Sequence, residues 1–98
     1  MKYRQGDLLI EKIAELPEYT QEQIKKDNVI LRGESTGHSH KLENGQVIQK
    51  WQELYLIVND KGRIVHDEHS PIDLPAGYYA VKRQRQYVAE GEEETVND

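Results

Sequence analysis

The residues best suited to chemistry in this chain are its four histidines, which fall into two tight clusters. His38 and His40 are separated by one serine, and His66 and His69 are separated by Asp67-Glu68. Imidazole is the side chain used most often to bind metal ions and to transfer protons near neutral pH. The clusters therefore predict a site of one of these two kinds, provided that folding brings them together.

The two clusters make different demands on the local structure. Side chains alternate between faces along a strand, so His38 and His40 are expected to project from one face. His66 and His69 are three positions apart, and a straight strand would place them on opposite faces. They converge only if the strand ends or bulges between them, as strands often do where a side chain is redirected toward a site.

Three or four imidazoles would form a nitrogen-rich site, which we expect to bind a transition metal (Zn, Ni, Fe or Cu) rather than Mg or Ca. The expected ligands are His38, His40, His66 and His69. Three ligands would leave a position open for water or substrate, whereas four would tend to close a structural site. Glu68 is the first choice for a further ligand or a catalytic general base. The sequence leaves open two simpler alternatives, which are metal-free acid–base histidines and histidines without chemistry.

A second candidate is the run from Tyr79 to Tyr87, in which basic and aromatic residues alternate. Alternation places Arg83 and Arg85 on the same face as Val81, which is expected to pack in the core. An arginine on such a face lies at a strand end, pairs with a buried carboxylate or binds an anion. The simpler alternative is that the second half of this strand leaves the core and is solvated. The functional alternative is that Arg83 or Arg85 binds a carboxylate or phosphate beside the histidines.

Short strand-like runs separated by turn residues dominate the chain. This pattern predicts an all-β domain, either a small antiparallel barrel or a sandwich. Asn44-Gly45 is typical of a tight hairpin, and a second turn is expected at residues 59–62. The longest predicted strand, residues 78–88, follows a turn at Ala76-Gly77. One or two helical turns are expected within residues 20–26, a segment too short to form a stable helix alone.

The 98 residues suit a single domain, which we place at residues 1–89. With one tryptophan and no phenylalanine, its core must be aliphatic and tyrosine-rich, and Trp51 is expected to belong to it or to cover it. Residues 90–98 carry five of the 18 acidic side chains and are expected to form a disordered tail. The formal net charge of −5 therefore leaves the body of the domain close to neutral.

Composition also restricts the partners and the location of the protein. The net negative charge argues against nucleic acid, whereas the near-neutral body is compatible with a small molecule or an anionic ligand. No apolar run approaches the ~20 residues of a membrane span, and the first residues do not resemble a signal peptide. The absence of cysteine excludes disulfides and thiolate metal sites. We expect a cytoplasmic protein without membrane contact, and its oligomeric state stays open.

Several segments resemble a family of small bacterial and phage-type proteins without an assigned function. The segments are residues 3–10, 33–40, 66–79 and 81–87. The resemblance covers most of residues 3–88 and implies a self-contained domain with a T-G-H-x-H block, an H-x-E-H block and a final R-Q-R-E-Y. Gln86 stands where that last motif carries glutamate. Paired histidines on a β scaffold are similar to cupins by analogy, although the chain is short for a cupin and lacks the complete cupin motif.

The leading hypothesis is a small β-domain that binds one transition metal through its histidines. If the site is open, metal-bound water would serve as nucleophile or proton carrier, so whether the protein is an enzyme stays open. One alternative is a non-catalytic binding or regulatory module of phage or bacterial origin that uses strand 78–88. Another is a metal-free phosphodiesterase or hydrolase with paired histidines as acid and base.

Overall fold

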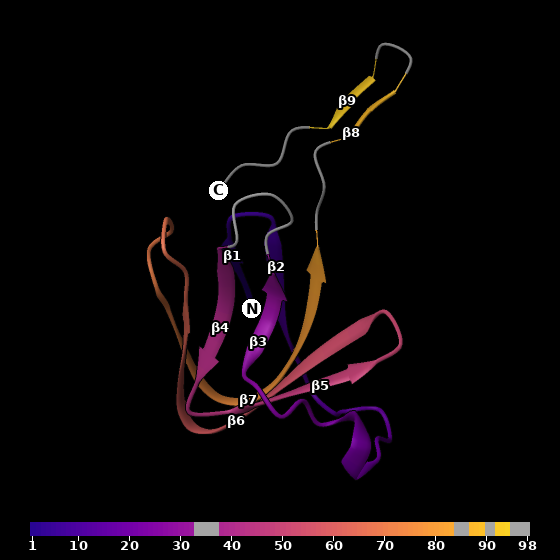
Figure 1. Ribbon diagram of the computed structural model, residues 1–98, viewed down its shortest axis with the longest axis vertical. Helices are drawn as coiled ribbons and strands as arrows, with labels where there is room; N and C mark the ends of the chain where they lie inside the picture. The colour runs from indigo at the N-terminus through magenta and orange to yellow at the C-terminus, as the bar shows by residue number, and fades with distance from the viewer. Residues whose placement is uncertain (33–37, 84–86, 90–91, 95–98) are drawn as a thin grey trace.

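The computed structural model describes residues 1–32, 38–83, 87–89 and 92–94, which form mostly β-strands (Figure 1). The strands are β1 (Lys2–Gln5), β2 (Leu8–Ile13), β3 (Val29–Arg32), β4 (Ser39–Glu43), β5 (Gln46–Lys50), β6 (Glu53–Val65), β7 (Ile72–Arg83), β8 (Tyr87–Ala89) and β9 (Glu92–Glu94). Seven of them form one antiparallel sheet in the order β1-β2-β7-β6-β4-β3, and β5 also pairs with β6.

The predicted all-β class is confirmed. The segment predicted to contain a short helix holds one turn of 3-10 helix, Gln21–Gln23. Among the described residues, no helix is long and apolar enough to cross a membrane.

The long hairpin of β6 and β7 is the frame to which the other strands attach. Its pairing runs from Leu54 opposite Val81 to Ile64 opposite Ile72, and its register shifts between Val58 and Lys61. A bulge of this kind bends a strand and increases its twist. In Figure 1 both strands curve through the base of the molecule. Because β2 pairs with one half of β7 and β4 with the opposite half of β6, the sheet curls on itself without closing.

Two of the predicted turns are wrong, because the strands continue through them. Residues 59–62 lie within β6, and Ala76-Gly77 lies within β7. Residues 59–61 are exposed and occupy the bulge, and Gly62 permits the bend because a Cβ there would lie 3.0 Å from Val58 Cγ2. Glycine and polar residues thus indicate a departure from a regular strand, but they do not indicate whether the chain reverses.

The hairpin predicted at Asn44-Gly45 is also wrong. β4 and β5 both pair with β6 in antiparallel fashion, so they lie end to end along one edge of β6. Asn44 adopts φ 62°, and a Cβ at Gly45 would lie 2.6 Å from the carbonyl oxygen of Ile57. Asn44 supplies the left-handed backbone of a kink, and Gly45 permits the close approach to β6. Long-range pairing with β6, not the local turn signal, decides where the chain goes.

The hairpin in this region joins β5 to β6 through Trp51-Gln52, with Lys50 opposite Glu53. Trp51 has φ 54° and is 84% exposed. The expectation that Trp51 belongs to the core or covers it is therefore wrong. Its place at the tip of a hairpin holds the indole away from the apolar residues.

The predicted strand 78–88 needs correction. β7 ends at Arg83, and β8 forms a separate two-stranded sheet with β9. β9 consists of Glu92–Glu94 and lies within the segment predicted to form the tail, whose disorder stays a prediction. The rest of the predicted tail lies outside the described residues.

The core lies inside the curl of the sheet. Its buried residues are Leu8, Ile10, Ile30, Leu42, Val47, Leu56, Val58, Ile64, Leu74, Tyr79 and Val81. One polar side chain, Gln5 on β1, is also only 2% exposed. Its Nε2 donates to the carbonyl oxygen of Ile64 on β6 at 3.0 Å. This bond connects an end strand of the sheet to the inner surface of β6, and it directs the Gln5 side chain toward the histidines.

Candidate functional site

All four histidines lie together, although they come from two distant segments. His66 is at the centre of the group. Its ring centroid lies 5.7 Å from that of His38, 4.3 Å from that of His40 and 4.6 Å from that of His69. The rings of His40 and His69 are nearly parallel, with centroids 6.2 Å apart. We call these four residues the histidine cluster.

Local structure explains how each pair reaches the cluster. β6 ends at Val65, and the chain bends through residues 67–69 before β7 begins. This bend lies where the sequence required one, and it returns His69 to the side of His66. His40 lies on β4 and is 4% exposed, whereas His38 precedes β4 and is only partly buried. The rings of both residues approach His66, as alternation along a strand predicts.

Gln5 determines the orientation of His40 and the position of its proton. Gln5 Nε2 donates to the carbonyl oxygens of Ile64 at 3.0 Å and Ser70 at 2.8 Å. The other amide atom, Oε1, lies 2.9 Å from His40 Nδ1 and can only accept. Nδ1 therefore carries the proton, and in the neutral ring Nε2 keeps its lone pair. Nε2 is the His40 atom that a cation could use.

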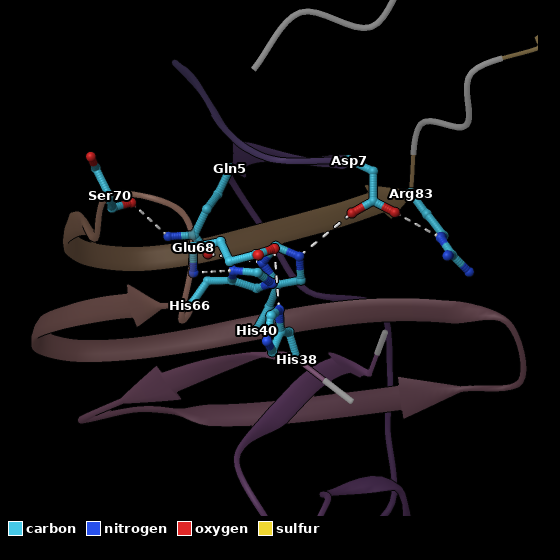
Figure 2. Close-up of polar contacts among 8 residues, drawn as sticks. All are labelled: Gln5, Asp7, His38, His40, His66, Glu68, Ser70 and Arg83. Carbon is cyan, nitrogen blue, oxygen red and sulfur yellow. Dashed lines mark hydrogen bonds and ion pairs between the residues drawn. The ribbon is translucent and has the colours of Figure 1, made fainter. Parts of the chain in front are cut away.

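A carboxylate faces that nitrogen. Asp7 Oδ1 lies 3.5 Å from His40 Nε2, and Arg83 Nε donates to Asp7 Oδ2 at 2.9 Å (Figure 2). Asp7 belongs to the two-residue turn between β1 and β2, where Gln5 is paired with Leu8. On its other side, Leu8 pairs with Arg83 of β7. The register of β1, β2 and β7 therefore places Asp7 beside Arg83.

The same turn also contacts the second histidine pair. Gly6 has φ 59°, and a Cβ built on it would lie 2.7 Å from His69 Nε2. The His69 ring therefore lies directly against the backbone beside Asp7. Gln5 and Asp7 are not among the site residues predicted from the sequence. The only available signal was a Gly-Asp tight turn between two strands, which by itself indicates a hairpin and no chemistry.

The outer edge of the cluster contains an acidic contact. His38 Nδ1 lies 3.1 Å from Glu68 Oε1, and the Glu68 side chain is 63% exposed. The backbone N–H of Glu68 donates to His66 Nδ1 at 3.0 Å. Glu68 thus positions His66 through its main chain, while its carboxylate lies beside His38 and is open to solvent.

The electrostatic environment keeps the inner rings neutral. Burial, followed by the charge that His66 would carry, lowers the pKa of His40 from 6.5 to about 4. Burial and then the neighbouring His69 and His38 also lower the pKa of His66. Burial raises the pKa of Asp7, but the hydrogen bond from Arg83 and the bond from its own backbone outweigh this effect and hold the pKa below its ordinary value. Near neutral pH the site therefore combines the neutral imidazoles of His40 and His66 with the ionised carboxylate of Asp7.

Most of the residues predicted for the site are thus brought together. The four histidines and Glu68 form one group, and Arg83 joins it through Asp7, as an arginine paired with a carboxylate. Arg85 lies outside the described residues. Within residues 1–32 and 38–83, no three or more His, Cys, Asp or Glu side chains have donor atoms already placed to hold a metal ion.

A comparison with protein families assigns the chain to a family of unknown function. Residues 4–84 match the family described as "Domain of unknown function (DUF8820)", and the chain belongs to it. The matched region includes the whole seven-stranded sheet except its first two residues and the complete histidine cluster. No curated protein and no solved structure matches the chain.

Proposed function

We propose that this protein binds one transition-metal ion in the histidine cluster. The observation that supports the proposal is the central position of His66, whose ring lies within 5.7 Å of all three other rings. Because a zinc–nitrogen bond measures about 2.0–2.1 Å, two imidazoles on one tetrahedral ion have centroids roughly 5 Å apart. Nitrogen ligands favour Zn, Ni, Fe or Cu over Mg or Ca.

Binding requires the rings to turn. His66 Nδ1 now accepts a backbone hydrogen bond from Glu68, so a neutral His66 carries its proton on Nε2. A cation at the centre would be bound by nitrogen lone pairs that at present face other groups. Rotation of the histidine rings about χ2 moves only the side chains. The backbone of the bend that contains His66 and His69 can keep its conformation.

The metal content of untagged protein tests the proposal. After loading with Zn²⁺ or Co²⁺ and removal of excess ion, we expect about one ion per chain in the wild type. His66→Ala should lose it, because His66 contacts every other ring of the cluster. Arg63→Gln is a matched surface control, since Arg63 and its partner Asp73 are well exposed and form an ion pair with each other. Equal metal content in the wild type and His66→Ala would refute the proposal.

A hydrolytic enzyme is the functional extension of this proposal. A bound transition metal supplies a water molecule of lowered pKa. Glu68 would act as the general base, because its carboxylate is solvent-exposed and lies 3.1 Å from His38 Nδ1. With chromogenic phosphate and carboxylate esters, Glu68→Gln should lower turnover while the metal content stays unchanged. Turnover that persists after exhaustive chelation would favour the metal-free alternative, in which His38 and Glu68 act as an acid–base pair.

The other expectations stay proposals. We retain an anionic or small-molecule ligand as the partner class and the cytoplasm as the location, because the chain has no cysteine and a near-neutral body. We also propose that the T-G-H-x-H and H-x-E-H blocks are shared across the family, which an alignment of its members would test. A non-catalytic binding module that uses residues 78–88 stays an alternative proposal, and β7 carries this segment as far as Arg83.

A further inference from the structure

We infer that Asp7 is an oxygen ligand of the metal ion, and that Arg83 holds its carboxylate in the ligating orientation. This inference rests on the proposed metal site and names a ligand outside the two histidine blocks. It begins with the contact between His40 and Asp7, whose Nε2 and Oδ1 atoms lie 3.5 Å apart.

The contact joins two groups that both accept hydrogen bonds. Gln5 can only accept from His40 Nδ1, so the proton of the neutral ring is on Nδ1 and a lone pair is on Nε2. An ionised Asp7 oxygen is also an acceptor. A direct charge-assisted N–H···O bond is about 2.7–2.9 Å long, and the observed separation is longer. A cation between the two atoms would satisfy both of them.

The separation fits an ion shared by these two atoms. With metal–ligand bonds of about 2.0–2.2 Å and a tetrahedral angle, a ligating nitrogen and a ligating oxygen are roughly 3.4 Å apart. The observed 3.5 Å agrees with this value without any movement of the backbone. His40 and Asp7 are therefore already close to a ligating arrangement.

Asp7 also has the support that metal-binding carboxylates usually have. Its second oxygen accepts from Arg83 Nε at 2.9 Å, which leaves Oδ1 directed at His40. Hydrogen bonds of this type orient a ligand, and their loss typically lowers metal affinity 10–100-fold. The contact does not depend on a flexible loop, because Leu8, the residue after Asp7, is paired with Arg83 in the sheet.

The turn that contains Asp7 brings the second histidine pair to the same point. Since Gly6 has no Cβ, the His69 ring can lie against it, and any side chain at this position would lie 2.7 Å from Nε2. His66 lies between His40 and His69. The resulting ligand set is His40, His66 and His69 with Asp7, which leaves His38 beside Glu68. Four protein ligands close a tetrahedral site, so hydrolysis at this ion would require a fifth position for water. Three imidazoles and one carboxylate suit a divalent ion such as Zn²⁺, Fe²⁺ or Co²⁺ rather than monovalent copper, which prefers sulfur ligands.

Cobalt binding to the full chain tests the inference. The Co²⁺ affinity, measured against a competing chelator, and the visible d–d spectrum are compared in wild type, Asp7→Ala, Asp7→Asn and Arg83→Gln. We expect Asp7→Ala and Asp7→Asn to lower the affinity more than about 100-fold and to change the spectrum, because a ligand is lost. Arg83→Gln should lower the affinity by about 10–100-fold with the wild-type spectrum, as expected for an orienting residue.

The surface pair Arg63–Asp73 provides matched controls. Its Nε–Oδ1 distance is 2.7 Å and both side chains are well exposed, so Asp73→Asn and Arg63→Gln make the same changes of charge in a solvent-exposed pair. Both should bind Co²⁺ like the wild type.

The inference is overturned if Asp7→Asn keeps the wild-type affinity and spectrum while His66→Ala loses the ion, an outcome that leaves the proposed function intact. If the wild type itself binds no Co²⁺ or Zn²⁺, both proposals fail. Circular dichroism of each variant separates loss of a ligand from loss of the fold, and Asp7→Asn, which keeps the shape of the side chain, serves if Asp7→Ala does not fold.

Discussion

The side chain of Gln5 accepts a hydrogen bond from His40 Nδ1 at 2.9 Å, and both residues are almost completely buried. Gln5 lies on β1, one end strand of the sheet, and His40 lies on β4, near the other end. The same amide donates to the carbonyl oxygens of Ile64 and Ser70, on β6 and after it. One side chain therefore joins both ends of an open sheet and also determines which histidine nitrogen faces Asp7.

Replacing Gln5 should weaken the fold and the site together. Gln5→Ala leaves the Nδ1 donor of His40 and the carbonyl oxygens of Ile64 and Ser70 without their present partner, and each such loss at a buried group costs about 1–3 kcal/mol. We expect urea unfolding to show a loss of about 3 kcal/mol or more, with weaker Co²⁺ binding. Gln49→Ala, at an exposed position of β5, is the control and should change neither quantity. Equal free energies of unfolding for Gln5→Ala and Gln49→Ala would show that the hydrogen bonds of Gln5 make no net contribution to stability.

A methyl group at Gly6 should affect the metal site more than an equivalent change elsewhere. Gly6→Ala introduces a Cβ at 2.7 Å from His69 Nε2 and forces alanine to adopt φ 59°. The strained backbone costs about 1–2 kcal/mol, and displacement of His69 should lower Co²⁺ affinity. Gly77→Ala is the matched control, because its φ is 151° and its Cβ would contact only the flexible end of Lys12. It should lose stability without losing metal affinity, and the same loss of affinity in both variants would contradict a local role for Gly6.

Acid should destabilise the metal-free protein through His40. Its pKa is lowered from 6.5 to about 4 in the folded protein by burial and then by His66, so the unfolded chain binds more protons within this window. Stability is therefore fully present above about pH 6.5 and is lost as the pH falls toward 4. A shift of this size corresponds to roughly 3 kcal/mol.

Urea unfolding of chelated protein between neutral pH and pH 4 measures this loss. His40→Asn removes the titrating group, so its stability should fall less over the same window than that of the wild type. Parallel pH profiles for the two proteins would mean that His40 is not the group responsible.

The tip of the β5–β6 hairpin should tolerate replacement of its tryptophan. Trp51 is 84% exposed and has φ 54°, a conformation that asparagine adopts much more readily than bulky residues do. Trp51→Asn is expected to keep or raise the melting temperature, with a gain of up to about 1 kcal/mol. As the only tryptophan, Trp51 should also show the red-shifted fluorescence of a solvated indole in the wild type. A blue-shifted emission together with a marked fall in melting temperature would show that Trp51 is covered in solution.

The β class and the shared face of His38 and His40 could be predicted from the sequence, because both depend on the two-residue period of a strand. The alternation that places Tyr79 and Val81 inside and Lys82 outside is local in the same way. Turn signals were less informative. Asn44-Gly45 and Ala76-Gly77 both supply unusual backbone geometry, but neither reverses the chain, because pairing with distant strands competes with the local preference.

The sequence by itself determined which side chains could do chemistry, since residue types and local spacing suffice to identify two histidine pairs and the bend that the second pair needs. Only the tertiary structure decided that the pairs share one site, that His66 lies at its centre, and that Gln5, Asp7 and Arg83 complete it. The physical reason is that those three residues reach the histidines through the register of β1, β2 and β7 and the curl of the sheet. Register and curl arise from long-range pairing and from the bulge in β6, and no short stretch of sequence specifies them.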